Sequence, residues 1–242
     1  MTDREIALRA LHCLDLTNLN ETCSAADIDA LIAKSRTPFG SVTAICIWPR
    51  FVNQAKVLLD GNIHLATVVN FPSGDESTEA VCEMTRQAIA DGADEIDVVL
   101  PWRTLMRGDI GTARKLLLSV AADVKARAHL KVILETGELK EPRLIRQASE
   151  LAIECGADFI KTSTGKTPVS ATAEAARVML ETIRASGKKV GFKASGGIRS
   201  FEDAKLYLDL CDKIMGADWA TPETFRFGAS GLLDALLERL NA

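Results

Sequence analysis

The chain has 242 residues, 47% of them hydrophobic and 26% charged, and its formal net charge is -4. This size suits either one α/β barrel or two small domains, and the negative charge, with an isoelectric point near 5.5, argues against a nucleic-acid or membrane surface. No apolar stretch approaches the roughly 20 residues of a membrane span, and residues 1–5 lack the apolar core of a signal peptide, so we expect a cytoplasmic protein.

Short apolar runs alternate with longer segments of helical periodicity along the whole chain. In chain order, strands are predicted at 13–16, 42–47, 64–69, 95–99, 131–134, 159–161, 190–193 and 225–227. Helices are predicted at 4–11, 25–35, 51–59, 77–91, 110–128, 141–155, 172–186, 200–210 and 230–240. Eight such units in a single domain, residues 1–242, predict a TIM (β/α)8 barrel with an extra N-terminal helix. The last strand has a rival in the apolar run at 215–219.

Two lysines interrupt apolar strands. Lys161 follows Phe-Ile at the end of the sixth predicted strand, and Lys193 follows Gly-Phe in the seventh. Strands of a parallel sheet are normally buried on both faces, so an ammonium group there needs either a charged partner or a chemical role.

Side chains alternate along a strand, so each polar residue can be assigned to one face. The alternation turns seven charged or nucleophilic residues toward the barrel axis: Asp15, Cys46, Glu95, Asp97, Lys131, Lys161 and Lys193. A barrel interior is normally filled by branched apolar residues. The charged set is either an ion network that only supports the barrel or a reactive site, and its size favours a site.

An amine acts as a nucleophile only when it is neutral. A lysine with the ordinary pKa near 10.4 needs that value lowered by roughly 3 units to be neutral at pH 7. A second ammonium group and an apolar wall both act in this direction. Lys161 and Lys193 suit such an arrangement, and these considerations leave open which of the two is the nucleophile.

Two glycine-containing turns predict a phosphate site. Gly196 and Gly197 follow the seventh predicted strand, and Gly228 precedes the last helix. Barrels commonly bind phosphate after strands seven and eight, where backbone N–H groups converge. A nucleotide-binding P-loop is the competing interpretation of residues 160–167, but Ile160 takes the place of its first glycine and Pro168 follows directly.

Longer motifs then carry a resemblance to a known family. They lie at 14–17, 44–50, 66–72, 92–99, 131–139, 158–166, 190–197 and 225–230, and so span nearly the whole chain. Together they resemble the deoxyribose-phosphate aldolases. These class I aldolases cleave 2-deoxy-D-ribose 5-phosphate to D-glyceraldehyde 3-phosphate and acetaldehyde, in deoxyribonucleotide catabolism.

The resemblance implies roles for individual residues. Lys161 would form the Schiff base, Lys193 would suppress its protonation, and Asp97 would transfer protons with a bound water. Substrate and phosphate would be held by Thr164, Gly165, Lys166, Gly196, Gly197, Arg199, Gly228 and Ser230. Supporting positions around the reacting groups would be Asp15, Cys46 and Lys131, while Glu95 is expected to be structural. Neither a metal nor an organic cofactor is implied.

Cys46 lies on the inward strand face, so its thiol is expected to look into the same cavity as Lys161. A free cysteine is usually a small buried hydrophobe. Beside a site that concentrates aldehydes, we nevertheless expect unsaturated aldehydes to modify Cys46, and Cys46→Met to keep most of the activity.

Two departures from the family pattern and two rival functions complete the sequence analysis. Gly231 stands where many members carry a second serine, which implies weaker phosphate binding, and a tyrosine-ended tail found in some members would be absent after Ala242. A silent phosphosugar-binding barrel would lack the amine chemistry, and a transaldolase-like enzyme would use another donor. The expected partners are phosphosugar and aldehyde substrates, with a homodimer implied by the resemblance.

Overall fold

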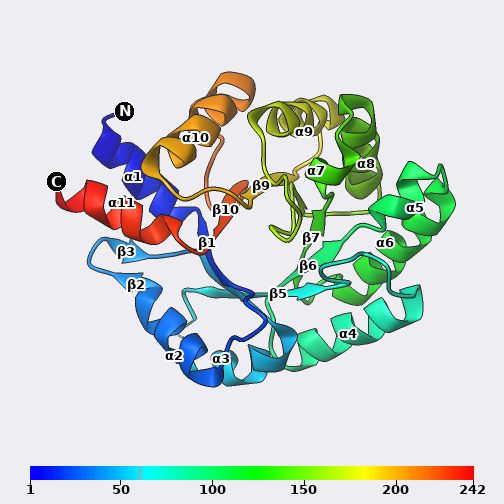
Figure 1. The fold of residues 1–242 in the computed structure, drawn as a ribbon, viewed down its shortest axis with the longest axis horizontal. Helices are drawn as coiled ribbons and strands as arrows, with labels where there is room; N and C mark the ends of the chain where they lie inside the picture. Colours follow the sequence, from blue (N-terminus) through cyan, green and yellow to red (C-terminus); the bar gives the residue numbers. More distant parts are fainter. Residues whose placement is uncertain (60) are drawn as a thin grey trace.

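The computed structural model describes residues 1–59 and 61–242 and forms a closed barrel of parallel strands (Figure 1). The barrel strands are β1 (Leu14–Asn18), β4 (Ala44–Ile47), β5 (His64–Val69), β6 (Glu95–Val99), β7 (His129–Ile133), β8 (Phe159–Lys161), β9 (Gly191–Ser195) and β10 (Phe225–Ala229). Each strand pairs with its neighbour in the chain, and β1 closes the barrel by pairing with both β4 and β10. The predicted barrel and its eight strands are confirmed, including the last, because 215–219 holds only the end of a helix and a turn.

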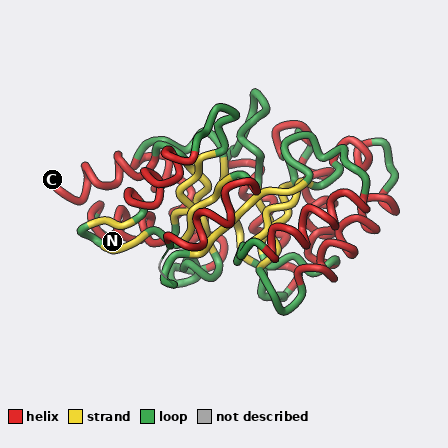
Figure 2. Tube along the Cα trace, turned by 90° about the horizontal axis from the view of Figure 1, so that it is seen from below, coloured by secondary structure: helices red, strands yellow, loops and turns green. Residues whose placement is uncertain are grey.

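Helices surround the strands, which occupy the middle of the molecule in Figure 2. They are α1 (Asp3–His12), α2 (Ala25–Lys34), α3 (Val52–Leu58), α4 (Thr78–Ala90), α6 (Ile110–Val124), α8 (Pro142–Glu154), α9 (Ala173–Ser186), α10 (Phe201–Met215) and α11 (Leu232–Asn241). All the predicted helices are therefore present, including the extra one before the first strand. The first and last of them, α1 and α11, pack side by side (Figure 1).

The helix starts follow from local side-chain chemistry. Ser24, Ser77, Thr172 and Ser200 each precede a helix and accept a hydrogen bond from a backbone N–H of its first turn. Such caps satisfy N–H groups that have no partner within the helix. Pro142 begins α8, where the proline ring suits the first helical position.

Five short elements escaped the sequence prediction. They are β2 (Arg36–Thr37) and β3 (Gly40–Ser41), which form a small hairpin, the 3-10 turn η1 (Pro49–Phe51), α5 (Trp102–Met106) and α7 (Thr136–Leu139). None is long enough to show a period of 2 or 3.6 residues, which is the signal that identifies elements in a sequence.

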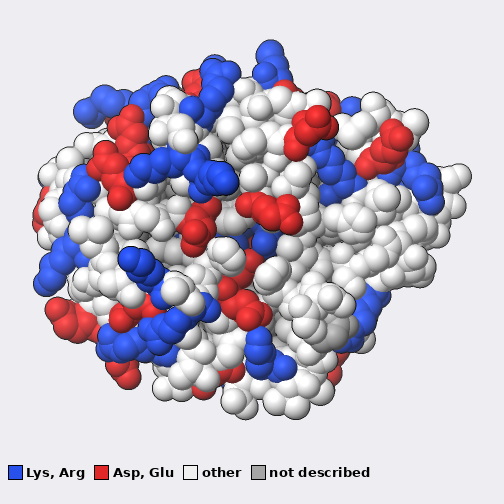
Figure 3. Space-filling model, turned by 180° about the vertical axis from the view of Figure 1, so that it is seen from behind, with Lys and Arg blue, Asp and Glu red and all other residues white. Residues whose placement is uncertain are grey.

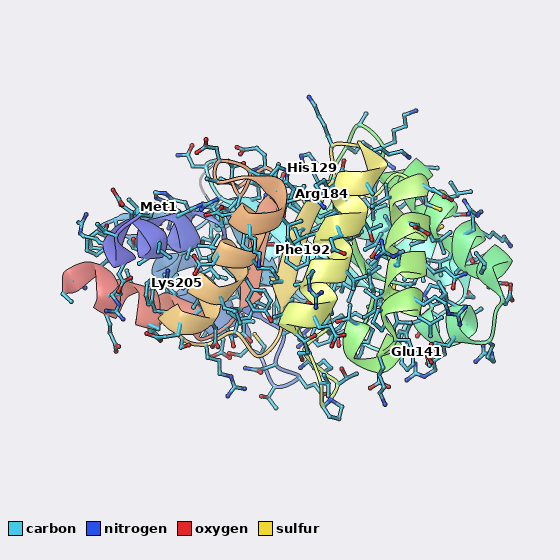
Figure 4. The ribbon with its side chains drawn as sticks, turned by 90° about the horizontal axis from the view of Figure 1, so that it is seen from above. Met1, His129, Glu141, Arg184, Phe192 and Lys205 are labelled. Atoms are coloured by element: carbon cyan, nitrogen blue, oxygen red, sulfur yellow. The ribbon has the colours of Figure 1, made fainter. Side chains whose placement is uncertain are left out.

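The main hydrophobic core lies between the barrel and its helices. Alternation turns Ile96 and Val98 of β6 outward into this layer, together with Phe225 and Phe227 of β10, whose ring centroids are 4.7 Å apart. Phe192 of β9 joins the same layer beside α9 and α10 (Figure 4). Since apolar side chains fill this outer layer, the opposite faces of the same strands are left to line the barrel interior.

Two aspartates tie strands together at the end where the strands begin. Asp94 accepts a hydrogen bond from the backbone N–H of Leu65 at 3.0 Å, and Asp158 accepts one from Leu130 at 2.8 Å. In Figure 4 this end of the barrel lies toward the top, where His129 is labelled, and Glu141 marks the opposite end. The strand register is therefore secured at the end remote from the strand C-termini.

Charged groups of both signs are interspersed on the face shown in Figure 3. Among the described residues, no helix is both long and apolar enough to cross a membrane.

Close packing inside the barrel yields the first prediction. A Cβ atom added to Gly191 would lie 2.3 Å from Cε1 of Phe159, its partner on β8. We expect Gly191→Ala to lower the free energy of unfolding by about 1–3 kcal/mol, because the buried ring must move. Urea denaturation measures this change.

The matched control is Gly111→Ala in α6, where the new Cβ would meet only Asp109 Oδ1, at 3.6 Å. Alanine should stabilise this helix by up to about 1 kcal/mol. Equal unfolding midpoints for the two variants would show that the barrel interior tolerates the added methyl group.

Candidate active site

Seven charged side chains from six strands form one ion network inside the barrel. They are Asp15 of β1, Glu95 and Asp97 of β6, Lys131 of β7, Lys161 of β8, Lys193 of β9 and Arg226 of β10. All are buried, with side chains at most 5% exposed. The inward orientation predicted for the first six is confirmed, since each makes an ion pair within the barrel.

Asp97 is the centre of this network. Its Oδ2 accepts hydrogen bonds from Lys161 Nζ at 2.8 Å and from Lys193 Nζ at 2.9 Å, while its Oδ1 accepts one from Lys131 Nζ at 3.1 Å. The Nζ atoms of Lys161 and Lys193 therefore contact the same carboxylate oxygen and are close neighbours. The paired lysines anticipated from the sequence are brought together.

Arg226 is a member of the network that the sequence analysis missed. Its guanidinium donates to Asp15 Oδ1 at 2.7 Å and to Glu95 Oε1 at 2.9 Å. The signal was present, because Phe225 and Phe227 are the apolar residues of β10 and alternation turns the residue between them inward.

Opposite charges outweigh the effect of burial on the pKa values of Asp97 and Lys193. Burial would raise the pKa of Asp97, but its three lysine neighbours hold that pKa well below its ordinary range. Burial would lower the pKa of Lys193, but Asp15 and Asp97 raise it above its ordinary value. Asp97 is therefore a carboxylate and Lys193 an ammonium group at neutral pH.

Lys161 is held less tightly than the other buried lysines. Within the described residues it donates one hydrogen bond to a carboxylate, whereas Lys131 and Lys193 donate two each. It is also 2% exposed, against 0% for the other two. Of the three buried amines, Lys161 therefore makes the fewest contacts with carboxylates.

A cavity of about 380 Å³ opens at the C-terminal ends of the strands, above the network. All eight residues predicted to hold substrate and phosphate line it: Thr164, Gly165, Lys166, Gly196, Gly197, Arg199, Gly228 and Ser230. A Cβ on Gly228 would lie 3.0 Å from Cε of Lys193, so this glycine brings the cavity floor against the network. The volume suits a small organic ligand.

The cavity wall is suited to an anion. Helix α11 begins beside Ser230, and no side chain caps its first turn in the described structure. Free N–H groups at a helix N-terminus attract negative charge.

Lys34 of α2 also lines the cavity, although nothing in the sequence distinguished it from other surface lysines. Lys166 contributes differently from expectation, because its Nζ donates to the carbonyl oxygen of Leu19 at 2.8 Å.

Glu135 is a second residue that the sequence analysis left unassigned. It follows β7 in the left-handed region, at φ 59°, and is fully buried. Its carboxylate accepts hydrogen bonds from Thr164 N at 3.2 Å and Oγ1 at 2.5 Å, and from Thr167 Oγ1 at 3.3 Å. Burial raises the pKa of Glu135. The carboxylate thus fixes the loop that follows Lys161.

The expectation that unsaturated aldehydes modify Cys46 stays a prediction, and two features of its surroundings bear on it. The thiol faces the barrel interior as predicted. It lies close enough to Lys193 to influence the pKa of that lysine. However, Cys46 is 0% exposed, packs beside Ala66 and Val68, and is not among the cavity-lining residues. Burial also raises the pKa of its thiol, so the reactive thiolate is disfavoured.

The P-loop alternative does not agree with the observed backbone. Residues 160–161 end β8, residues 162–172 form a loop, and the next helix begins only at Ala173. A P-loop would lead its lysine directly into a helix. Among the described residues, no group of three or more His, Cys, Asp or Glu side chains is arranged to hold a metal ion.

Comparisons with known proteins agree with this geometry. The model of the DeoC/LacD aldolase family matches residues 9–237. The deoxyribose-phosphate aldolase of Agrobacterium fabrum (strain C58 / ATCC 33970) is 56% identical over 239 residues, which cover 98% of this chain and 92% of that protein.

Solved structures are similar as well. A putative deoxyribose-phosphate aldolase from Coccidioides immitis is 28% identical with a TM-score of 0.86, and the match covers 96% of this chain and 86% of that one. One from Toxoplasma gondii ME49 has a TM-score of 0.90, covers 99% and 97% of the two chains, and at 23% identity supports the fold alone.

The contact between Glu135 and Thr164 can be tested by stability. Thr164→Val removes the hydroxyl that donates to the buried carboxylate and accepts from Lys166 N. We expect a loss of about 1–3 kcal/mol in the free energy of unfolding. Thr164→Ser, which keeps the hydroxyl, is the matched control. If urea unfolding gives the same value for both variants, the hydroxyl does not hold the loop.

Proposed function

Because the chain belongs to the DeoC/LacD family of aldolases, we propose that it reversibly cleaves 2-deoxy-D-ribose 5-phosphate to D-glyceraldehyde 3-phosphate and acetaldehyde through an imine on Lys161. Aldolase activity follows from the family and from the 56% identical relative. The substrate, the covalent mechanism and the roles of individual residues are the proposal.

One observation carries the proposal: Lys161 is the least tightly held amine of a network that contains four cations and three carboxylates. Loss of one proton balances the charges of this network, and Lys161 forms the fewest ion pairs. A neutral amine below a cavity suited to an anion is the arrangement that a Schiff-base aldolase for a phosphosugar requires.

The first half of the reaction is addition and dehydration. Neutral Lys161 attacks C1 of the open-chain sugar, and the carbinolamine loses water to give an iminium ion. Lys193 remains an ammonium group, so its charge opposes protonation of the neighbouring amine and can supply a proton to the departing hydroxyl. Asp97 accepts hydrogen bonds from both amines and keeps them in position.

Cleavage breaks the C2–C3 bond. A base removes the proton of the C3 hydroxyl, the C2–C3 electron pair moves toward the iminium nitrogen, and D-glyceraldehyde 3-phosphate leaves from an enamine. We assign the proton transfers to Asp97 acting with a water molecule. Protonation of the enamine at C2 and hydrolysis of the imine then release acetaldehyde and free Lys161.

The phosphate is assigned to the opposite end of the cavity. The glycine turns at Gly196, Gly197 and Gly228 allow backbone N–H groups to approach it, and the start of α11 adds the partial positive charge of its dipole. Arg199 lines the same cavity and would supply a full charge, and Lys34 would do so on leaving Asp234, with which it is paired at 2.7 Å. Lys166 would have to leave Leu19 to do so.

The two rival functions differ from this proposal in how they would use the Lys161 amine. A silent phosphosugar-binding barrel has no need for an excess buried cation, and a transaldolase-like enzyme would keep the imine while using another donor. We further propose that residues 1–242 act as a single aldolase domain and that this domain forms a homodimer. Its metabolic role would be the breakdown of deoxyribonucleotides.

Reductive trapping tests the covalent step. Borohydride added together with acetaldehyde should inactivate the protein and leave an ethyl group on Lys161, detectable by peptide mass spectrometry. Lys161→Arg should abolish cleavage, because a guanidinium group stays protonated and cannot form an imine. The exposed Lys213→Arg is the control and should retain activity. An ethyl group found only on Lys193 would exchange the two assignments, and full activity of Lys161→Arg would remove the imine mechanism.

Asp97→Asn tests the proton transfers. The amide keeps the shape of the side chain but cannot act as a base, so cleavage should fall by at least about a hundredfold. The variant also leaves three lysines around an uncharged group, so circular dichroism must accompany the assay. Asp218→Asn, on the surface, is the control. A folded Asp97→Asn protein with wild-type turnover would limit Asp97 to the ion network.

A further inference from the structure

Arg226 closes the ion network at the end opposite to the cavity. It is 4% exposed, and its Cζ lies 5.3 Å from the centre of the Phe159 ring. Its guanidinium bridges Asp15 and Glu95. These two carboxylates in turn accept hydrogen bonds from Lys193 and Lys131. Arg226 therefore touches no cavity residue named for substrate binding, but it contacts the partners of both lysines that accompany Lys161.

The charges of the network can be counted with and without this residue. Asp15, Glu95 and Asp97 carry three negative charges. Arg226, Lys131 and Lys193 carry three positive charges, so these six groups balance without any contribution from Lys161. If Arg226 were uncharged, balance would require the proton on Lys161 instead, because unpaired charge is costly in a buried site.

We propose that Arg226 is a positioning residue that keeps the Lys161 amine available in its neutral form by neutralising Asp15 and Glu95 from below. The proposal rests on the proposed imine at Lys161. Arg226 acts through other residues, since it makes no contact with Lys161. Its fixed positive charge, which does not titrate at physiological pH, supplies the charge that would otherwise have to come from the nucleophile.

Other ionisable groups surround Lys161, and the experiment must separate them from Arg226. They are Asp97 of β6, Lys131 of β7, Lys193 of β9, Glu135 after β7, Cys46 of β4, and, one contact further away, Asp15 of β1 and Glu95 of β6. Each is retained in the two single variants Arg226→Met and Arg226→Lys, so a difference between those two proteins reports the charge of the arginine.

The proposal predicts opposite effects for two single substitutions. Arg226→Met removes a positive charge and should move the acidic limb of the kcat/KM profile to higher pH by about one unit, because Lys161 then keeps its proton longer. Glu95→Gln removes a negative charge and should move the limb to lower pH by a similar amount. The double variant keeps the wild-type balance and should return the limb to its original position.

The experiment measures cleavage of 2-deoxy-D-ribose 5-phosphate from pH 5 to 9 for the wild type, both single variants, the double variant and Arg226→Lys. Titration of the substrate phosphate is common to all five proteins and cancels in the comparison. Arg226→Lys retains the charge and should keep the wild-type limb. A purely structural role for Arg226 would lower stability in both single variants without moving their acidic limbs in opposite directions.

A second measurement does not depend on turnover. Acetic anhydride acetylates only neutral amines, so the pH dependence of Lys161 labelling, followed by peptide mass spectrometry, reports its protonation directly. If the wild type fails to cleave the substrate, the proposed function fails while the labelling still tests Arg226. If Arg226→Met does not fold, the acidic limbs of Glu95→Gln and of the double variant still test the proposal. Unchanged limbs and labelling profiles in the folded variants would overturn the proposal.

Discussion

Charges that leave water must be neutralised by one another, and this requirement organises the interior of the barrel. Moving an ion out of water costs several kcal/mol even after relaxation, so each buried carboxylate needs close cationic partners. Asp97 has three lysine partners. Asp15 and Glu95 both accept hydrogen bonds from Arg226, and each also accepts one from a lysine. No group of the network can change its charge without affecting the others. That coupling makes a chemically ordinary lysine sensitive to its surroundings.

The register of the strands places these charged partners next to one another. In the barrel, Lys161 of β8 lies level with Lys193 of β9, and Asp97 of β6 lies level with Lys131 of β7. Adjacent strands of a sheet are about 4.8 Å apart, so residues at the same level on one face are immediate neighbours. The apolar layer outside the barrel maintains this register, because a slip by one residue would turn every charge outward into the core.

Much of this arrangement could be predicted from the sequence, because alternation along a strand is a local property. It identified the inward positions of Asp15, Asp97, Lys161 and Lys193, and it would have identified Arg226 had the last strand been treated in the same way. What could not be predicted depends on contacts distant in sequence. The hydrogen bonds that Thr164 donates to Glu135 require an unusual backbone conformation between β7 and β8. Lys34 reaches the cavity only because α2 packs beside β1.

The aspartates that tie the strand starts, Asp94 and Asp158, lie at the end of the barrel opposite to the cavity. Alignment of the strands is thus maintained by groups that no ligand in the cavity touches. Loops at the other end can change in length and composition while the barrel stays intact, as loops generally tolerate such changes. This separation gives the molecule evolvability, because new substrate specificities can arise by replacing loops around an unaltered barrel interior.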